Sequence, residues 1–332
     1  MGNPAVNTAP QAHPNPWSFY PPCHKAGEHT EKILQLIDLP MKFDPDLCRS
    51  LLFVPAGNEG FLKSALQGDA DVIQLDLEDS IAPNFKQAAR ASIRPTLRQV
   101  AAAKRTVAVR VNREDDLLIQ DLEAVVHPGL SALTIPKVET GEMLASLDQV
   151  VSKLETERGI ANGSIRLIAQ IESARGVLNA RELASATPRL VAMGIGMEDL
   201  IADVGGTVGA DALYFPAMQT LYATREAKVV PIGYLGSITV YKDTELFQDW
   251  IVRAKALGFE GGFCIHPNQV MILNETFCPT PDEVLTAQAI VKAAERHAQA
   301  GIAAFSHEGK MVDAPVVERA QRVLRLRNAY LR

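Results

Sequence analysis

Two apolar runs that end in carboxylates are the parts of this sequence most able to do chemistry. Leu167–Ala174 (LIAQIESA) contains Glu172, and Leu190–Leu200 (LVAMGIGMEDL) contains Asp199, 27 positions further along. Short buried apolar runs are typical of parallel strands, and this spacing is about one strand–helix unit. Because the C-terminal ends of adjacent strands in a parallel barrel lie side by side, we expect both carboxylates at one opening.

Two carboxylates held close together repel each other, so something must stabilise both anions. A hard divalent cation does this, and Mg²⁺ prefers oxygen ligands and keeps several waters. The four cysteines include no C-x-x-C pair, and no Cys or His cluster supplies a softer site. The sequence therefore predicts Mg²⁺, with Mn²⁺ as an alternative, on Glu172 and Asp199.

Each of these residues also has a purely structural interpretation. Asp199 could cap the helix that carries Leu200, and Glu172 could form a structural ion pair. Arg110 lies in the apolar run TVAVRVN and needs an anionic partner, either a ligand or a protein carboxylate such as Asp76 or Glu78. Asp313 precedes Ala-Pro, a pattern that by itself favours a helix N-cap.

Eight apolar runs alternate with helical patterns and predict an α/β fold. Their starts are spaced as the strand–helix repeats of a TIM (β/α)8 barrel require. No G-x-G-x-x-G motif follows the first run, which disfavours a dinucleotide-binding sheet. The runs are Ser50–Pro55, Val72–Leu77, Thr106–Asn112, Ala132–Pro136, Arg166–Glu172, Leu190–Gly194, Ile232–Ile238 and Gly262–His266.

Segments rich in polar residues and helical patterns flank the barrel. Residues 1–46 are rich in Pro and predict an N-terminal extension with a short amphipathic helix around residues 28–39. The barrel is expected over residues 47–275 and a C-terminal helical arm over residues 276–332. Within the arm, a loop (SHEGKMVDAP) should join two helices, and the arm could pack locally or reach a neighbouring subunit.

Composition excludes several classes of function. The chain has 332 residues, 47% of them hydrophobic, and a net charge of −6, so no basic field indicates nucleic-acid binding. No apolar run is long enough for a membrane span. The N-terminus lacks the cationic and apolar regions of a secretory signal. We therefore expect a cytoplasmic protein.

In its motifs the chain resembles the aldolase/citrate lyase family, which includes citrate lyase beta subunits, malyl-CoA lyases and citramalyl-CoA lyases. The motifs occur in family order over nearly the whole expected fold. They are RSLLFVPAGN (Arg49–Asn58), LDLEDSIAPNFKQAAR (Leu75–Arg90), VRVN (Val109–Asn112), IPKVET (Ile135–Thr140), IESARG (Ile171–Gly176), GMEDLIADVG (Gly196–Gly205), IHPNQ (Ile265–Gln269) and GKMVDAP (Gly309–Pro315).

The resemblance implies a TIM barrel with Mg²⁺ bound by Glu172 and Asp199. It implies that Arg110 binds the carboxylate or carbonyl end of the substrate, and that Asp313 acts as acid/base from a neighbouring subunit of a homo-oligomer, a trimer or hexamer. The segments LDLED and KQAAR would be mainly structural. The chain departs from the family where basic residues are common, since Glu59–Gly60 follow Asn58 and Gly262 precedes FCIHP.

The resulting hypothesis is a Mg²⁺-dependent carbon–carbon lyase that cleaves a malyl-, citramalyl- or citryl-type 3-hydroxyacyl thioester to a 2-keto acid and an acyl thioester. The thioester would be on CoA or on a carrier protein. Three alternatives stay open. They are a metal aldolase on free hydroxy-keto acids without CoA, a Schiff-base aldolase using Lys137, and a non-catalytic subunit that binds an acyl-carrier partner through its N-terminal extension.

Overall fold

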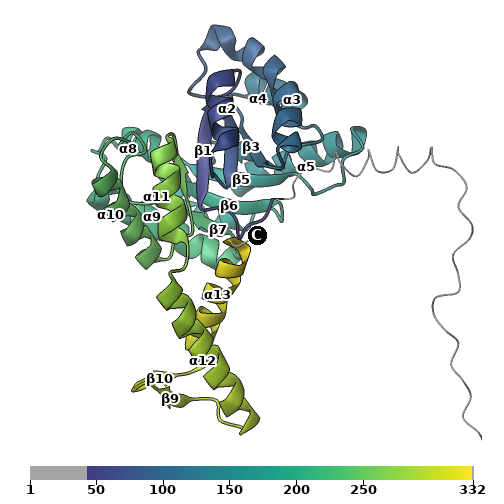
Figure 1. Ribbon diagram of the computed structural model, residues 1–332. Helices are drawn as coiled ribbons and strands as arrows, with labels where there is room; N and C mark the ends of the chain where they lie inside the picture. Colours follow the sequence, from purple (N-terminus) through teal and green to yellow (C-terminus); the bar gives the residue numbers. More distant parts are fainter. Residues whose placement is uncertain (1–42, 331–332) are drawn as a thin grey trace, which may run out of the picture. The chain divides into compact units, whose positions relative to one another are not determined.

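Eight parallel strands form the central sheet, with neighbours in the order β7-β6-β5-β4-β3-β2-β1-β8 (Figure 1). The structure is a computed structural model that describes residues 43–330. A bridge between Ile232 and Gly261 joins the two ends of the sheet, so the predicted TIM barrel is confirmed. The strands are β1 Ser50–Pro55, β2 Val72–Asp76, β3 Thr106–Arg110, β4 Ala132–Ile135, β5 Arg166–Ile171, β6 Leu190–Ile195, β7 Val230–Ile232 and β8 Gly262–Cys264.

The seventh strand lies earlier in the chain than predicted. Val230–Ile232 forms β7, whereas the predicted run Ile232–Ile238 shares only Ile232 with it. Gly233 leaves the strand with a φ of +156°, and Tyr234 and Leu235 are buried in a loop. The hydroxyl of Tyr234 donates to the carbonyl of Phe263 at 3.1 Å. The predicted run is apolar because much of it is buried, but a buried segment need not be a strand.

Helices cover the outside of the barrel (Figure 1). A short 3₁₀ turn, Pro83–Phe85, precedes α3. The glycine-rich segment GGTVG begins where α8 ends, since Gly205 terminates that helix with a φ of +70°, a conformation that favours glycine. The helices are α2 Glu59–Gln67, α3 Lys86–Ala102, α4 Asp115–Val125, α5 Gly141–Glu157, α6 Ala174–Leu178, α7 Ala180–Ala184, α8 Met197–Val204, α9 Ala210–Ala227, α10 Thr244–Leu257 and α11 Pro267–Phe277.

Alternate residues of each strand enter two different apolar clusters. Along β1, Leu51 joins the smaller cluster, in which Ile168 of β5 also lies, whereas Leu52 and Val54 join the larger one that includes the barrel helices. This alternation follows from the two-residue period of a strand. The strands are therefore buried on both faces, and polar side chains become accessible where the strands end.

Two helices and a hairpin follow the barrel. They are α12 Pro281–Gln299, β9 Phe305–His307, β10 Lys310–Val312 and α13 Ala314–Tyr330. The segment predicted as a loop (SHEGKMVDAP) thus forms most of a two-stranded hairpin. Its turn, Glu308–Gly309, has φ values of +49° and +74°, as a type I′ turn requires. Glu is unusual at the first of these positions, so the turn signal is weak in the sequence.

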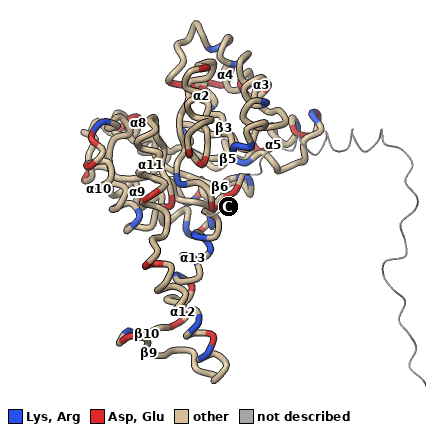
Figure 2. The backbone as a smooth tube through the Cα atoms, viewed as in Figure 1, with Lys and Arg blue, Asp and Glu red and all other residues tan. Residues whose placement is uncertain are grey.

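The C-terminal helix pair is attached to the barrel by charged side chains. Arg322 pairs with Glu260, Lys255 Nζ lies 3.0 Å from Glu283 Oε2, and Arg49 lies over the ring of Tyr330 at 4.2 Å. Figure 2 shows charges of both signs along the barrel helices and along α12 and α13. Of the described helices, none is both long and apolar enough to cross a bilayer. The helix predicted around residues 28–39 lies outside the described residues.

Candidate active site

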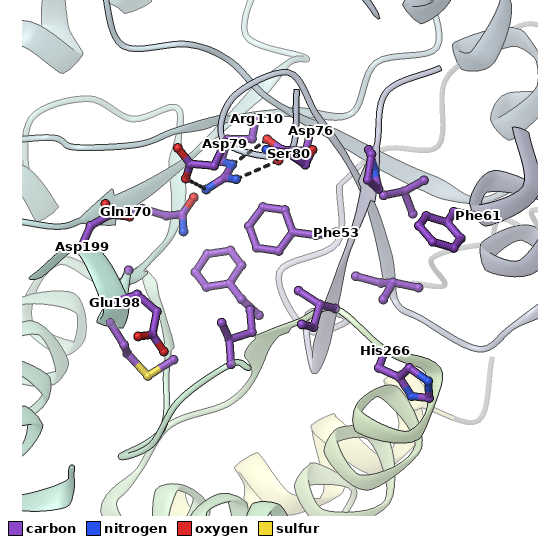
Figure 3. A pocket seen from close by; sticks show the side chains of 18 of the residues that line it. Phe53, Phe61, Asp76, Asp79, Ser80, Arg110, Gln170, Glu198, Asp199 and His266 are labelled. Carbon is purple, nitrogen blue, oxygen red and sulfur yellow. Dashed lines mark hydrogen bonds and ion pairs between the residues drawn. The ribbon is translucent and has the colours of Figure 1, made fainter. Parts of the chain in front are cut away.

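A cavity of about 710 Å³ opens at the C-terminal ends of the strands (Figure 3). Its lining includes Arg110, Glu172 and Asp199, three of the four residues predicted to carry chemistry. Asp313, the fourth, lies on the C-terminal arm and does not line this cavity. The position agrees with the general rule that TIM-barrel enzymes use this end of the barrel.

The register of β5 and β6 places Glu172 beside the start of α8. Ile171 pairs with Ile195, and the next residue on each strand is Glu172 and Gly196 respectively. The amide of Gly196 donates to the carbonyl of Ile171 at 2.9 Å. Gly196, not Asp199, is the N-cap of α8, so the capping interpretation of Asp199 is wrong.

Glycine at position 196 is required by the side chain of Glu172. A Cβ atom at Gly196 would lie 2.5 Å from Cγ and 2.6 Å from Oε1 of Glu172, closer than van der Waals contact allows. The bare backbone therefore makes the space into which the carboxylate fits. The predicted strand run Leu190–Gly194 ends two residues before this glycine, and nothing in the sequence indicated which side chain fills the space.

Glu172 is a buried carboxylate without partners. Only 4% of the residue is exposed, and within residues 43–330 neither carboxylate oxygen has a hydrogen-bond partner. Burial, and then the nearby charges of Glu78 and Asp199, raise the pKa of Glu172 to about 8. An unpaired buried carboxylate is costly, so this position favours a bound cation that would compensate its charge. The residues present thus fit a hard metal ion with oxygen ligands.

Arg110 is held by three carboxylates at the ends of β2 and β3. Asp76 and Arg110 are partners in the β2–β3 register, and Nε and Nη2 of Arg110 donate to Asp76 at 2.7 and 2.8 Å. Its Nη1 lies 3.1 Å from Glu78 and 3.3 Å from Asp79. Although burial alone lowers the pKa of Arg110, the bonds to Asp76 raise it above its usual value. The structural pairing considered for Arg110 is therefore present, and the side chain also lines the cavity.

Lys137 is engaged by the same acidic loop. Its Nζ lies 2.7 Å from Glu78 Oε1 and 3.8 Å from Asp79 Oδ1. Burial alone lowers the pKa of Lys137, but the hydrogen bond that its ammonium donates to the Glu78 carboxylate raises this pKa above its usual value. A Schiff base requires a neutral amine, and this ion pair stabilises the ammonium instead. Lys137 also does not line the cavity, which weighs against the Schiff-base alternative.

The loop after β2 is held in place by basic residues of α3. Lys86 Nζ donates to the carbonyls of Leu77 and Glu78 at 2.8 and 2.6 Å and to Asn112 Oδ1 at 2.6 Å. Arg90 binds Asp121 at 2.6 Å. These contacts support the structural interpretation of the LDLED and KQAAR segments, because they fix the backbone that carries the acidic side chains.

His266 and Asp313 both act as helix caps. His266 Nδ1 accepts a hydrogen bond from the amide of Asn268 at 3.1 Å, so this side chain caps α11. Asp313 accepts from the amide of Val316 at the start of α13, with 3.4 Å to its side-chain Oδ1. Within one chain, Asp313 thus has the capping role that its sequence pattern favours.

Some residues that line the cavity were not singled out in the sequence. Gln170 is buried, and its Oε1 lacks a partner in the described part of the chain. It precedes Glu172 by two residues in β5, so the strand period indicates the same face, a signal that was available. Phe53 and Phe263 also line the cavity, but aromatic residues in apolar runs carry no such signal.

Acidic groups outnumber basic groups at this opening. Asp76, Glu78, Asp79, Glu172 and Asp199 lie around Arg110 and Lys137, and each contacts or electrostatically influences another member of the group. Such a cluster of carboxylates in the mouth of a barrel, one of them a buried glutamate whose pKa is raised, is typical of an enzyme active site. The fold and this site together define a TIM-barrel enzyme with an acidic centre.

Comparison with known proteins identifies the family. The sequence profile of HpcH/HpaI aldolase/citrate lyase matches residues 49–267. The citrate lyase subunit beta of Leuconostoc mesenteroides subsp. cremoris is 34% identical over 286 residues, which cover 85% of this chain and 94% of that protein. The L-malyl-CoA/beta-methylmalyl-CoA lyase of Rhodobacter capsulatus is 30% identical over 302 residues, covering 84% and 94% respectively.

A solved structure shows the same relationship. The CitE protein of Mycobacterium tuberculosis, crystallised with magnesium, acetoacetate and coenzyme A, is 29% identical with a TM-score of 0.67, and the alignment covers 86% of this chain and all of that one. The chain belongs to the HpcH/HpaI aldolase/citrate lyase family. It is an enzyme of the carbon–carbon lyase type.

Proposed function

We propose that this enzyme cleaves a 3-hydroxyacyl thioester of the malyl, citramalyl or citryl type and that it requires Mg²⁺ or Mn²⁺. The observation that carries the proposal is the buried, unpartnered carboxylate of Glu172 beside Asp199, in a cavity that also contains Arg110. Relatives act on or bind matching molecules, since one is a malyl-CoA lyase and another was crystallised with magnesium and coenzyme A.

In the proposed reaction, Glu172 and Asp199 hold the cation, which when bound polarises the hydroxyl and carboxylate of the substrate. The hydroxyl proton passes to the carboxylate of Asp313, and the guanidinium of Arg110 stabilises the negative charge that develops on the oxygen. The carbon–carbon bond breaks, and its electron pair passes to the carbon next to the thioester carbonyl. Asp313 then gives that carbon a proton, so the products are a 2-keto acid and an acyl thioester.

One alternative retains support from the cavity. A metal aldolase that acts on free hydroxy-keto acids needs no cations for CoA phosphates, and Arg110 is the only Lys or Arg among the described residues that line the cavity. A non-catalytic role receives no such support, because Arg110, Glu172 and Asp199 all lie where a reaction would require them.

A substrate panel tests the proposal. Purified enzyme is incubated with malyl, citramalyl and citryl thioesters and with the corresponding free acids, with Mg²⁺ or with excess EDTA, and release of glyoxylate, pyruvate or oxaloacetate is measured. We expect release from at least one thioester with Mg²⁺ and none with EDTA. Full turnover in EDTA, or release from free acids alone, would contradict the proposal, the latter in favour of the aldolase.

We also propose that Asp313 completes the site of a neighbouring subunit, which makes the enzyme an obligate homo-oligomer. Asp313 lies between β10 and α13, beyond the last barrel strand, and does not line the cavity of its own chain. Exchange of such an arm between subunits is a low-cost route to assembly.

Mixed oligomers separate this role of Asp313 from simple capping. Serine caps a helix as well as aspartate does, so capping alone predicts that Asp313→Ser stays active. We expect Asp313→Ser to be folded but inactive, and a mixture of Asp313→Ser with inactive Glu172→Gln subunits to regain part of the activity after subunit exchange. The shared site would be excluded by mixtures that remain inactive after exchange is shown by mass spectrometry, or by activity of Asp313→Ser alone.

A further inference from the structure

The cavity at the barrel mouth has two chemically different parts. One part carries the charged groups of Asp79, Arg110 and Asp199. The other is formed by β1, α2 and β8 and is apolar, with Phe53 between the two parts (Figure 3). The volume of about 710 Å³ is typical of sites that enclose a whole small molecule, so there is room beyond the charged part for more of a substrate.

Phe53 is the point where the charged part meets the apolar part. The guanidinium carbon of Arg110 lies 4.5 Å from the centre of the Phe53 ring, and the centres of the Phe53 and Phe263 rings lie 5.7 Å apart. Phe53 and Ile238 both pack against the cluster inside the barrel that contains Phe263. A substrate held at Arg110 and Glu172 would therefore extend directly onto an aromatic surface.

The apolar part continues across the top of β1. Phe53 packs with the inner cluster and Leu52 and Val54 with the outer one, yet all three line the cavity. Beyond them, α2 contributes Phe61, which is 58% exposed although it is a large apolar side chain. Figure 3 shows Phe61 across Phe53 from Arg110. Phe53 and Phe61 are the large apolar side chains that this part exposes to the cavity, because Leu52, Val54 and Phe263 are almost fully buried behind them.

The lack of basic side chains among the described residues of the apolar part disfavours a phosphate group there and favours an apolar group. The residues of the apolar part bring no Lys or Arg to the cavity, so a phosphate group would gain no ion pair there. An alkyl or aryl group would bury apolar surface against Phe53 and Phe61, which is favourable in proportion to the area removed from water. The apolar part of the cavity therefore favours substrates that place an apolar group in it.

We propose that the enzyme prefers a hydroxyacyl substrate whose acyl chain carries an apolar substituent, an alkyl chain of about three or more carbons or an aryl group, bound against Phe53 and Phe61. This inference rests on the proposed lyase function and adds the class of acyl group. A single additional methylene in a hydrophobic pocket changes kcat/KM by about tenfold or more. The unsubstituted acyl chain is then a poor substrate.

The test runs the reaction in the direction of condensation, with one thiol throughout. Acetyl, propionyl, pentanoyl and phenylacetyl thioesters are each combined with glyoxylate or pyruvate and Mg²⁺, and product is measured by mass spectrometry. We expect kcat/KM for pentanoyl or phenylacetyl to exceed that for acetyl by about tenfold or more. Equal or higher values for acetyl would overturn this inference and leave the lyase proposal standing. No condensation with any member would overturn both.

A pair of phenylalanine variants assigns the preference to the apolar part of the cavity. Phe61→Gln removes the aromatic ring from an exposed helical position, and Phe215→Gln does the same on α9, where Phe215 is 61% exposed and does not line the cavity. We expect Phe61→Gln to lower the pentanoyl-to-acetyl ratio of kcat/KM by about fivefold or more, whereas Phe215→Gln leaves it unchanged. An unchanged ratio in Phe61→Gln would show that the apolar part of the cavity does not select the acyl group.

Discussion

Glu172→Gln will abolish turnover while the barrel remains folded and becomes no less stable. Glutamine has nearly the same shape as glutamate and fits the space beside Gly196, but it carries no charge to hold a cation. We expect kcat to fall below detection and the binding of Mn²⁺, followed by its paramagnetic signal, to weaken strongly. Asp199→Asn should have the same effect on both measurements.

The direction of the stability change follows from the pKa of Glu172. Since the folded state raises this pKa to about 8, the folded protein binds a proton more tightly than the unfolded chain, whose carboxyl has an ordinary value near 4.5. Glu172 therefore makes the free energy of unfolding fall as pH rises from about 4.5 to about 8. Glutamine removes this loss, so the Tm of Glu172→Gln in EDTA at pH 8 should equal or exceed that of the unaltered protein.

A neutral variant elsewhere controls for the loss of one acidic group. Asp211 lies in the first turn of α9, as Asp199 lies in the first turn of α8, but it does not line the cavity. Asp211→Asn should keep both activity and Mn²⁺ binding. If Glu172→Gln turns over substrate at the normal rate, or if its Mn²⁺ affinity matches that of Asp211→Asn, Glu172 is not a metal ligand.

Arg110→Lys will lower kcat/KM by at least tenfold, which corresponds to about 1.4 kcal/mol of transition-state stabilisation. The planar guanidinium donates to both oxygens of Asp76 and still presents Nη1 to Glu78 and Asp79. A lysine ammonium is a single point of charge and cannot keep this orientation while it binds a substrate carboxylate. Steady-state kinetics with the best thioester of the panel give the measurement.

Arg90→Lys separates catalysis from simple loss of a buried ion pair. The side chain of Arg90 is 10% exposed, like that of Arg110, and pairs with buried Asp121, but Arg90 does not line the cavity. Both variants should lose stability, and only Arg110→Lys should lose catalysis. Kinetics of Arg110→Lys that match those of Arg90→Lys would show that Arg110 has only a structural role.

The strand pattern and the main acidic residues could be predicted from the sequence because each has a local signal. A buried parallel strand is an apolar run, and a carboxylate at its end stands out, as Glu172 does after LIAQI. The position of β7 could not be predicted in this way, because Tyr234 and Leu235 are equally buried in a loop. The hairpin around Glu308–Gly309 depends on a positive φ at a glutamate, which composition does not reveal.

The sequence carried no comparable signal for contacts between residues that are far apart in the chain. The three carboxylates that share Arg110 lie at the end of β2 and in the loop after it, and only the β2–β3 register decides which of them reaches the guanidinium. Likewise, the space that Gly196 leaves for Glu172 depends on the pairing of β5 with β6. Sequence patterns identified the chemical groups, whereas the barrel determined their partners.

The excess of acidic groups around Arg110 imposes an order on how the site fills. With Glu172 ionised, the carboxylates at this opening, which include Glu198, outnumber the two cations Arg110 and Lys137, and both cations already have carboxylate partners. An anionic substrate that arrives first meets net repulsion, whereas one that arrives after a divalent ion meets attraction. If the bound ion raises the affinity for the substrate by some factor, the bound substrate must raise the affinity for the ion by the same factor. We infer that the enzyme binds its two ligands cooperatively, the ion first, and that it releases the ion readily once the products have left.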